Sequence, residues 1–313
     1  MGMIFDQIIN NFRLGFDYAL EQLINGINIG GIYALIAVGY TMVYGIIQLI
    51  NFAHGEIYML GAYFAFTFYT IFNLPLALAA VLSIILCLLL GIFLEFIAYR
   101  PLRNAPRLAA LITAIGASLF LQNLALIIWG GTPRSFPEFT LPDFFESPII
   151  TLHGDATISL LQYDIFLITA LLMLGLHVLI TRTNIGIAMR ACAQDKTTAS
   201  LMGINVNKVI TFTFAVGSSL GAVAGILAAL YYNIIKHTIG YVAGIKAFAA
   251  AVLGGIGNVP GAMLGGYVLG IAETFGAGYI SSPYRDGIAY AIMILVIILR
   301  PSGLLGKKQV VKV

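Results

Sequence analysis

The sequence predicts an all-α membrane protein, a polytopic bundle of eight or nine helical spans in which some segments are candidate re-entrant half-helices. Composition is the first observation behind this class. Of 313 residues, 60% are hydrophobic and 9% are charged, and the mean hydropathy is +0.98, whereas soluble domains are about 25% charged. The second observation is spacing, because the apolar residues fall into runs near the ~20 residues that a membrane-spanning helix needs. The net charge of +3 is too small for a nucleic-acid-binding surface, so no nucleic-acid partner is expected.

Nine apolar runs predict the spans in order. They lie at about 23–48, 56–73, 75–98, 108–129, 164–181, 208–232, 241–256, 260–280 and 286–299. Before them, residues 3–20 space their apolar side chains helically, which is typical of an interfacial helix or of an extension of the first span. The seventh and eighth runs are short and rich in glycine. They are therefore either full spans or half-spans that re-enter the bilayer with their free backbone groups buried in protein.

Charge predicts which loops face which side of the membrane. Loop 130–163 carries four acidic residues against one arginine, and eleven of the sixteen Lys and Arg residues cluster after the third, fifth and last spans. Because basic loops stay in the cytoplasm, we expect loop 130–163 outside, and loop 182–207 and the C-terminus inside, in the inner (plasma) membrane. Neither loop is long enough for a core of its own, so residues 1–313 are expected to form a single transmembrane domain.

Glycines recur at four-residue intervals in several spans. Gly217, Gly221 and Gly225 lie on one face of the sixth span, and Gly26 and Gly30 lie on one face of the first. In lipid, helices associate through the close backbone approach that small residues allow. We therefore expect these faces to pack within the chain, with a contact between subunits as the alternative.

Polar side chains inside the spans are costly and mark candidate functional sites. Asn51, His54, Glu56 and Glu273 lie where burial is expected, so they are candidates for a translocation path or for helix packing. Lys246 is instead expected to extend its ammonium group outward to the membrane surface.

Chemical motifs are absent from the sequence. It contains no phosphate-binding loop, no H-E-x-x-H or C-x-x-C spacing and no G-x-S-x-G element. We therefore expect no catalytic residue, no metal site and no cofactor, and we expect that the chain is not an enzyme.

The internal loop 182–207 predicts a short helix at about 185–202 along the cytoplasmic face. Thr183 or Asn184 is suited to cap its start, and Gly203 is suited to end it in a left-handed conformation. Gly186 and Gly203 bracket this helix, and Arg190 and Asp195 are available to a partner. The loop is longer than a hairpin requires, which favours docking of another polypeptide over a plain connector.

Three segments of the chain resemble LivH-type permeases, the membrane subunits of ABC importers for branched-chain amino acids. They are residues 39–56 (GYTMVYGIIQLINFAHGE), 182–195 (RTNIGIAMRACAQD) and 248–266 (FAAAVLGGIGNVPGAMLGG), in the order of the family. The resemblance extends over about residues 20–305. It also aligns residues 197–203 with the Glu-Ala-Ala-xxx-Gly signature of the coupling loop, where Ala199 and Gly203 match. Thr stands in place of the Glu, so Arg190 and Asp195 would supply the charged contacts to an ATPase.

The resemblance implies a transport subunit that works with other chains. These would be two ATP-hydrolysing subunits, a second related permease and an extracytoplasmic substrate-binding protein, within the membrane lipid. The alternatives from the residues alone are a stand-alone secondary carrier or channel, with its binding site at the glycine-rich helices 241–280, and a membrane-embedded enzyme.

Overall fold

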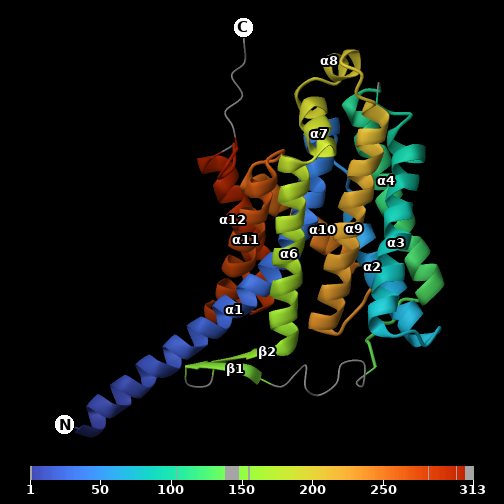
Figure 1. Ribbon diagram of the computed structural model, residues 1–313. Coiled ribbons are helices and arrows are strands. Elements are labelled where there is room, and N and C mark those ends of the chain that lie inside the picture. Colours follow the sequence, from blue (N-terminus) through green and yellow to red (C-terminus); the bar gives the residue numbers. More distant parts are fainter. Residues whose placement is uncertain are drawn as a thin grey trace.

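The computed structural model describes residues 2–103, 105–137, 148–153, 156–280, 282–300 and 302–306, and this part of the chain is mainly helical (Figure 1). Its helices are α1 (Gly2–Ile47), α2 (His54–Thr70), α3 (Leu76–Leu94), α4 (Arg107–Trp129), α6 (Leu160–Arg182), α7 (Asn184–Gln194), α8 (Lys196–Leu201), α9 (Val206–Tyr232), α10 (Ile239–Gly254), α11 (Val259–Tyr279) and α12 (Arg285–Leu299). A π-helical turn, Glu95–Tyr99, extends α3, and a 3-10 turn, Ser282–Tyr284, precedes α12. The strands β1 (Pro148–His153) and β2 (Ala156–Ser159) form an antiparallel hairpin.

The helical class is confirmed, but the count of eight or nine spans is not. In the described residues, five helices are long and apolar enough to cross a membrane, or six if the bent pair of α10 and α11 counts as one span. The reason lies in length: α2, α10 and α12 have 17, 16 and 15 residues, short of the ~20 that span the hydrocarbon. Helices α10 and α11 are bent by 120° at their break, which fits the expectation that this region is interrupted.

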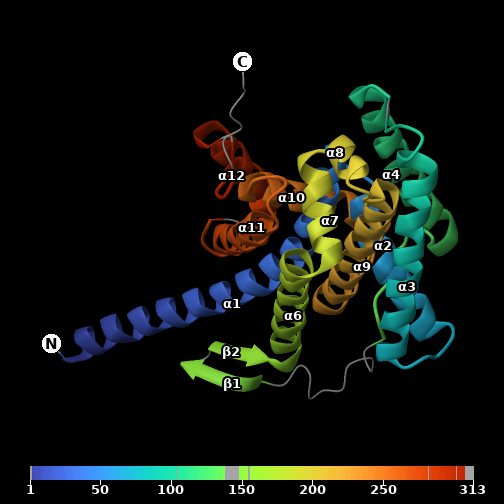
Figure 2. The same ribbon diagram turned by 45° about the horizontal axis from the view of Figure 1, so that its top comes forward.

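Helix α1 is continuous from Gly2 to Ile47. Of the two expectations for residues 3–20, the extension of the first span is therefore the one observed. Its N-terminal half projects away from the bundle, beside the β1–β2 hairpin (Figures 1 and 2). Its C-terminal half runs through the centre, where residues 29–43 are almost entirely buried.

The core is built on two helix pairs that glycines bring together. In the first pair, a Cβ added to Gly270 of α11 would lie 2.3 Å from the backbone nitrogen of Gly30 in α1. In the second pair, a Cβ added to Gly225 of α9 would lie 1.9 Å from the carbonyl oxygen of Tyr58 in α2. These glycines pack within the chain, as the four-residue spacing predicts.

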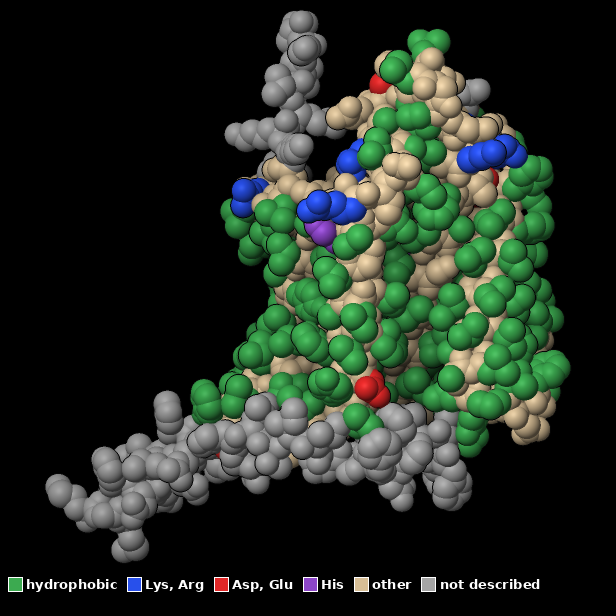
Figure 3. All heavy atoms as spheres, in the orientation of Figure 1, with side chains coloured by type: hydrophobic (Ala, Val, Ile, Leu, Met, Phe, Trp, Pro, Cys, Tyr) green, Lys and Arg blue, Asp and Glu red, His purple; other side chains and the backbone are tan. Residues whose placement is uncertain are grey.

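Helices α3, α4 and α6 surround this core. Only 22% of the most apolar window of each is buried, against 89% for α1 and 78% for α9. Their outer faces present leucine, isoleucine and phenylalanine side chains, and hydrophobic side chains cover most of the face drawn in Figure 3. Such surfaces suit contact with lipid or with another membrane subunit.

Two breaks in the helices precede α2 and α10. Residues 48–53 separate α1 from α2, and residues 233–238 separate α9 from α10. Helix α2 begins beside the middle of α9, because His54 contacts Gly217 and Gly221. Helix α10 begins against the same place, since Gly240 packs on Gly55. The N-terminal ends of two helices therefore meet inside the bundle.

Candidate functional site

Asn51, His54 and Glu56 lie together at the start of α2, and all three are buried. The Oδ1 atom of Asn51 accepts a hydrogen bond of 2.7 Å from the Tyr99 hydroxyl. The His54 ring packs edge-to-face on Tyr40, with ring centroids 4.9 Å apart. The sequence prediction that these residues are buried is confirmed for each of them.

Glu56 lies where the starts of α2 and α10 meet. Its Oε1 atom accepts a hydrogen bond of 3.0 Å from Ser118, and its Oε2 atom has no hydrogen-bond partner among the described residues. A Cβ at position 240 would lie 2.4 Å from that Oε2 atom, so only a glycine leaves room for the carboxyl group. The positive N-terminal end of each helix favours an anionic group there.

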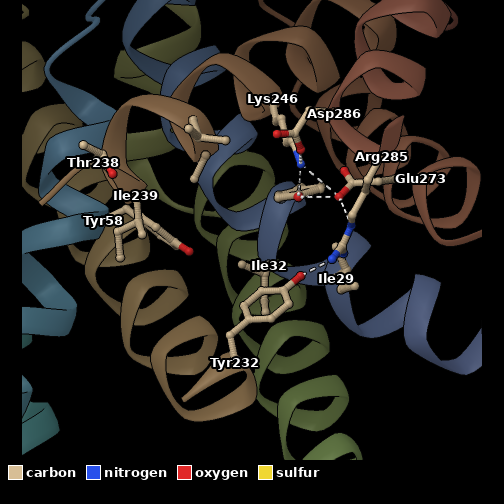
Figure 4. Close-up of a pocket in the computed structure, with 13 residues that line it drawn as sticks. Ile29, Ile32, Tyr58, Tyr232, Thr238, Ile239, Lys246, Glu273, Arg285 and Asp286 are labelled. Atoms are coloured by element: carbon tan, nitrogen blue, oxygen red, sulfur yellow. Dashed lines mark hydrogen bonds and ion pairs between the residues drawn. The ribbon is translucent and has the colours of Figure 1, made fainter. Parts of the chain in front are cut away.

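Glu273 lies in a second, separate cluster that joins α10, α11 and α12. Its Oε1 atom is 2.9 Å from Lys246 Nζ and 2.5 Å from Arg285 Nε, and it accepts a hydrogen bond of 3.2 Å from the Tyr33 hydroxyl. Asp286 Oδ1 is 2.6 Å from Lys246 Nζ. Two cations and two carboxylates therefore form one network of ion pairs (Figure 4).

This network borders a cavity of about 250 Å³ near the C-terminal end of α9. The aromatic and aliphatic residues of its wall come from α1, α2, α9 and α10 (Figure 4). They include Ile29, Ile32, Tyr33, Tyr58, Tyr232, Ile239 and Val242. Ligand sites are mostly apolar cavities with a few placed polar groups, and this cavity has both features.

The prediction that Lys246 extends outward is wrong. Its side chain is 6% exposed and pairs with Glu273 and Asp286. A buried ammonium group is stabilised by such partners, whereas snorkelling needs a clear path to the interface. Glu95 is also buried, and its carboxylate pairs with Arg103.

Sequence reasoning missed Arg285, Asp286 and Tyr33 as members of the ionic network. Arg285 and Asp286 stand at the polar boundary of the last predicted span, where charged residues are ordinary. The available signal is topological: consecutive helices usually pack together, so charges on α10, α11 and α12 are candidates to meet.

At the other end of α9, helices α7 and α8 form a projecting element (Figure 1). The predicted single helix at 185–202 is in fact two helices that break at Asp195. Thr183 caps α7 by accepting a hydrogen bond of 3.1 Å from the Gly186 backbone N–H, as expected. Gly203 has a φ of 85° and follows the end of α8, which confirms the predicted left-handed end.

Asp195 makes the break between the two helices by capping the start of α8. It accepts hydrogen bonds from the Thr198 hydroxyl at 2.6 Å and from the Thr197 backbone N–H at 2.8 Å. These bonds, the hydroxyl bond first, hold the pKa of the Asp195 carboxyl below its usual value. The stabilisation they give is therefore present at neutral pH and is lost only as the pH falls through that lowered pKa.

The other residues expected on this element have structural partners. Gly186 packs so closely on the end of α6 that a Cβ would lie 2.3 Å from the Ile180 carbonyl oxygen. Arg190 donates a hydrogen bond to the same carbonyl oxygen, and Ala199 is buried. The exposed surface of α8 includes Leu201 and Met202, which are 82% and 78% exposed.

Within the described ranges, no group of three or more His, Cys, Asp or Glu side chains is arranged to hold a metal ion. The acidic residues Glu138, Asp143, Glu146 and Asp155 of loop 130–163, and the basic residues Lys307, Lys308 and Lys312, lie outside the described residues.

Comparisons with known proteins give one consistent result. The model of a family described as branched-chain amino acid transport system / permease component matches residues 22–297. The chain is 48% identical over 302 residues to the high-affinity branched-chain amino acid transport system permease protein BraD of Pseudomonas aeruginosa, covering 94% of this chain and 98% of that protein. It is 45% identical over 309 residues to the corresponding permease protein LivH of Escherichia coli K12, covering 95% and 99%. A ribose import permease protein, RbsC of Haemophilus influenzae, is 26% identical over 297 residues, covering 93% and 88%.

Proposed function

Because the chain belongs to the family of permease components of branched-chain amino acid transport systems, we propose that it forms part of the membrane path by which branched-chain or related amino acids enter the cell. Its near full-length identity of 45–48% to two permeases named for these substrates is the observation that carries the proposal. The more distant ribose permease supports a transport role, and its lower identity favours amino acids as the cargo.

ATP hydrolysis would take place on partner chains, because the sequence contains no phosphate-binding loop. One of two ATPase subunits would dock on α7 and α8 of this chain, whose exposed Leu201 and Met202 project from the bundle, and the other would dock on the second permease. A short helix seated in a groove of each ATPase would transmit the closure of that subunit to the spans as a rigid lever. Gly186, Arg190, Asp195, Ala199 and Gly203 would maintain the shape of this element.

The remaining partners would be a second related permease and an extracytoplasmic binding protein. The end of the bundle with α7 and α8 would face the cytoplasm, because Lys and Arg side chains gather there (Figure 3). The binding protein would meet the opposite end, on the side of the β1–β2 hairpin. The apolar outer faces of α3, α4 and α6 would contact lipid or the second permease.

Reconstitution of the complete complex tests this function. In liposomes, leucine uptake should require the binding protein on one side and ATP on the other, and an ATPase variant that cannot hydrolyse ATP should abolish it. Uptake by this chain alone, driven by an ion gradient, would instead identify a secondary carrier. The purification of the chain with its ATPase provides an independent measurement.

A further inference from the structure

The ionic network around Glu273 divides into an enclosed pair and an accessible pair. Glu273 and Lys246 have side chains that are 0% and 6% exposed. Arg285 and Asp286, which are adjacent at the start of α12, have side chains that are 30% and 57% exposed. The enclosed pair fixes the position of its neighbours, whereas the accessible pair presents one cation and one anion to the cavity.

Both accessible groups retain hydrogen-bonding capacity. An arginine has five N–H donors. In the described residues, Arg285 donates one hydrogen bond, from Nη2 to the Tyr232 hydroxyl at 3.0 Å, and its Nε lies in the ion pair with Glu273. Asp286 uses Oδ1 toward Lys246, which leaves Oδ2 for another donor. A ligand with one negative and one positive group could therefore bind without breaking the network.

The cavity wall beside these charges is largely aliphatic. Ile29 and Ile32 come from α1, and Ile239 and Val242 come from the first turns of α10. Figure 4 shows Ile29 and Ile32 on the α1 side of the cavity, close to Arg285 and Tyr232. Burial of a branched aliphatic side chain against such a wall removes apolar surface from water and so stabilises binding.

We propose that this cavity binds the transported amino acid as a zwitterion, with Arg285 at the α-carboxylate, Asp286 at the α-ammonium group and the aliphatic wall around the side chain. This inference rests on the proposed transport function and extends it to a substrate site in the permease itself. The volume of about 250 Å³ lies near the lower limit of ligand pockets, ~300 Å³, which suits a single amino acid.

The position of the cavity fits a site on the outer half of the path. It lies by Tyr232, at the C-terminal end of α9, whereas α8 precedes the N-terminal end of α9. An amino acid released at the end opposite α7 and α8 would therefore meet this cavity first. The competing interpretation is a purely structural role, in which the ion pairs only hold α10, α11 and α12 together. The experiment below distinguishes this structural role from ligand binding.

Ligand analogues provide the test. The complex of permeases and ATPases is placed in lipid nanodiscs without the binding protein, and bound radiolabelled leucine is displaced by unlabelled leucine, by leucinamide, which lacks the carboxylate, or by 4-methylpentanoate, which lacks the ammonium group. We expect leucine to displace the label at concentrations about tenfold lower than either analogue, the loss expected for one charge-assisted hydrogen bond.

Two variants assign the groups. Arg285→Gln should weaken leucine binding about tenfold and remove the preference for leucine over leucinamide. Asp286→Asn should also weaken leucine binding about tenfold, and it should remove the preference for leucine over 4-methylpentanoate. Ion pairs with a purely structural role would not produce a loss of preference that is specific to the carboxylate in one variant and to the ammonium group in the other. Lys236→Gln is the control, because Lys236 is exposed near the start of α10 and does not line the cavity.

A third variant keeps the test independent of the ion pairs. Val242 is 39% exposed, so Val242→Phe should fold while filling the cavity, and it should weaken binding of leucine more than binding of alanine. The proposal is overturned if wild-type complex binds no leucine at millimolar concentration, or if folded Arg285→Gln and Asp286→Asn retain full discrimination. Failure of ATP-driven leucine uptake by the wild type with its binding protein would instead refute the proposed function.

Discussion

Gly225 has no space for a side chain, because a Cβ there would lie 1.9 Å from the Tyr58 carbonyl oxygen. We predict that Gly225→Ala separates α9 from α2 and lowers the stability of the protein. Overpacking of this kind costs about 1–3 kcal/mol, more than the 0.5–1 kcal/mol that alanine ordinarily gains over glycine in a helix. The measurement is the thermal unfolding midpoint of the purified protein in detergent.

Gly175 provides the matched control for that substitution. It also lies within a long helix, α6, but nothing is within 4 Å of the position of its Cβ. Gly175→Ala should therefore leave the unfolding midpoint unchanged or raise it slightly. Equal midpoints for the Gly225→Ala and Gly175→Ala variants would refute the close approach of α9 and α2.

Some properties of single residues could be predicted from the sequence and others could not. Burial of Glu56 and Glu273 could be predicted from a carboxylate within an apolar run, because position in the run is a local property. The burial of Lys246 and its pairing with Glu273 could not be predicted, because they depend on which helices surround α10. Glycine spacing was more informative, because four-residue periodicity fixes a helix face without reference to its neighbours.

In the α7–α8 element, the two ends were predictable from the sequence and the break between the helices was not. The caps at Thr183 and Gly203 follow from residue type and position. The break at Asp195 was not predicted, although aspartate is a favoured N-cap, because the segment 185–202 contains no proline or glycine at the break. Because of this break, α8 is a separate short helix, and its orientation depends on the cap at Asp195 and on the left-handed residue Gly203.

Gly203 is the sensitive end of that helix. Its φ is 85° and nothing lies within 4 Å of the position of its Cβ, so substitution acts through the backbone alone. We predict that Gly203→Val, which costs about 1–2 kcal/mol in the left-handed conformation, reduces leucine uptake and co-purification of the ATPase. Both are measured at equal abundance in the membrane.

Gly203→Asn is the comparison that isolates the backbone effect, because asparagine adopts the left-handed conformation far more readily than valine. It should retain uptake. Arg190→Glu is a poorer probe of docking, because Arg190 bonds to the Ile180 carbonyl oxygen and its loss also disturbs the end of α6. Normal uptake by Gly203→Val would identify the element as a connector.

The whole molecule departs from the sequence prediction in its spans. Hydropathy identifies apolar runs but does not show how deep in the bundle a helix begins. The sequence therefore predicts a full span for the run of α2 and leaves the run of α10 as either a full span or a re-entrant half-span. In the structure α2 starts at His54 and α10 starts at Ile239, and their first turns meet at Gly55 and Gly240, beside Glu56. Backbone without helical bonds is tolerated at such a place because protein surrounds it. The basic loops are a better guide, since Lys and Arg side chains gather at the α7–α8 end on the face drawn in Figure 3.

Cysteine labelling tests which end of the molecule lies in the cytoplasm. Both native cysteines, Cys87 and Cys192, are buried, so the background reaction with an impermeant maleimide in intact cells should be low. Ser135, beyond the end of α4, and Met202, after α8, are exposed at opposite ends of the bundle. We predict that Ser135→Cys reacts in intact cells, whereas Met202→Cys reacts only after the membrane is permeabilised. The reverse pattern would invert the orientation and would leave α7 and α8 on the side without ATP, where they could not couple hydrolysis to transport.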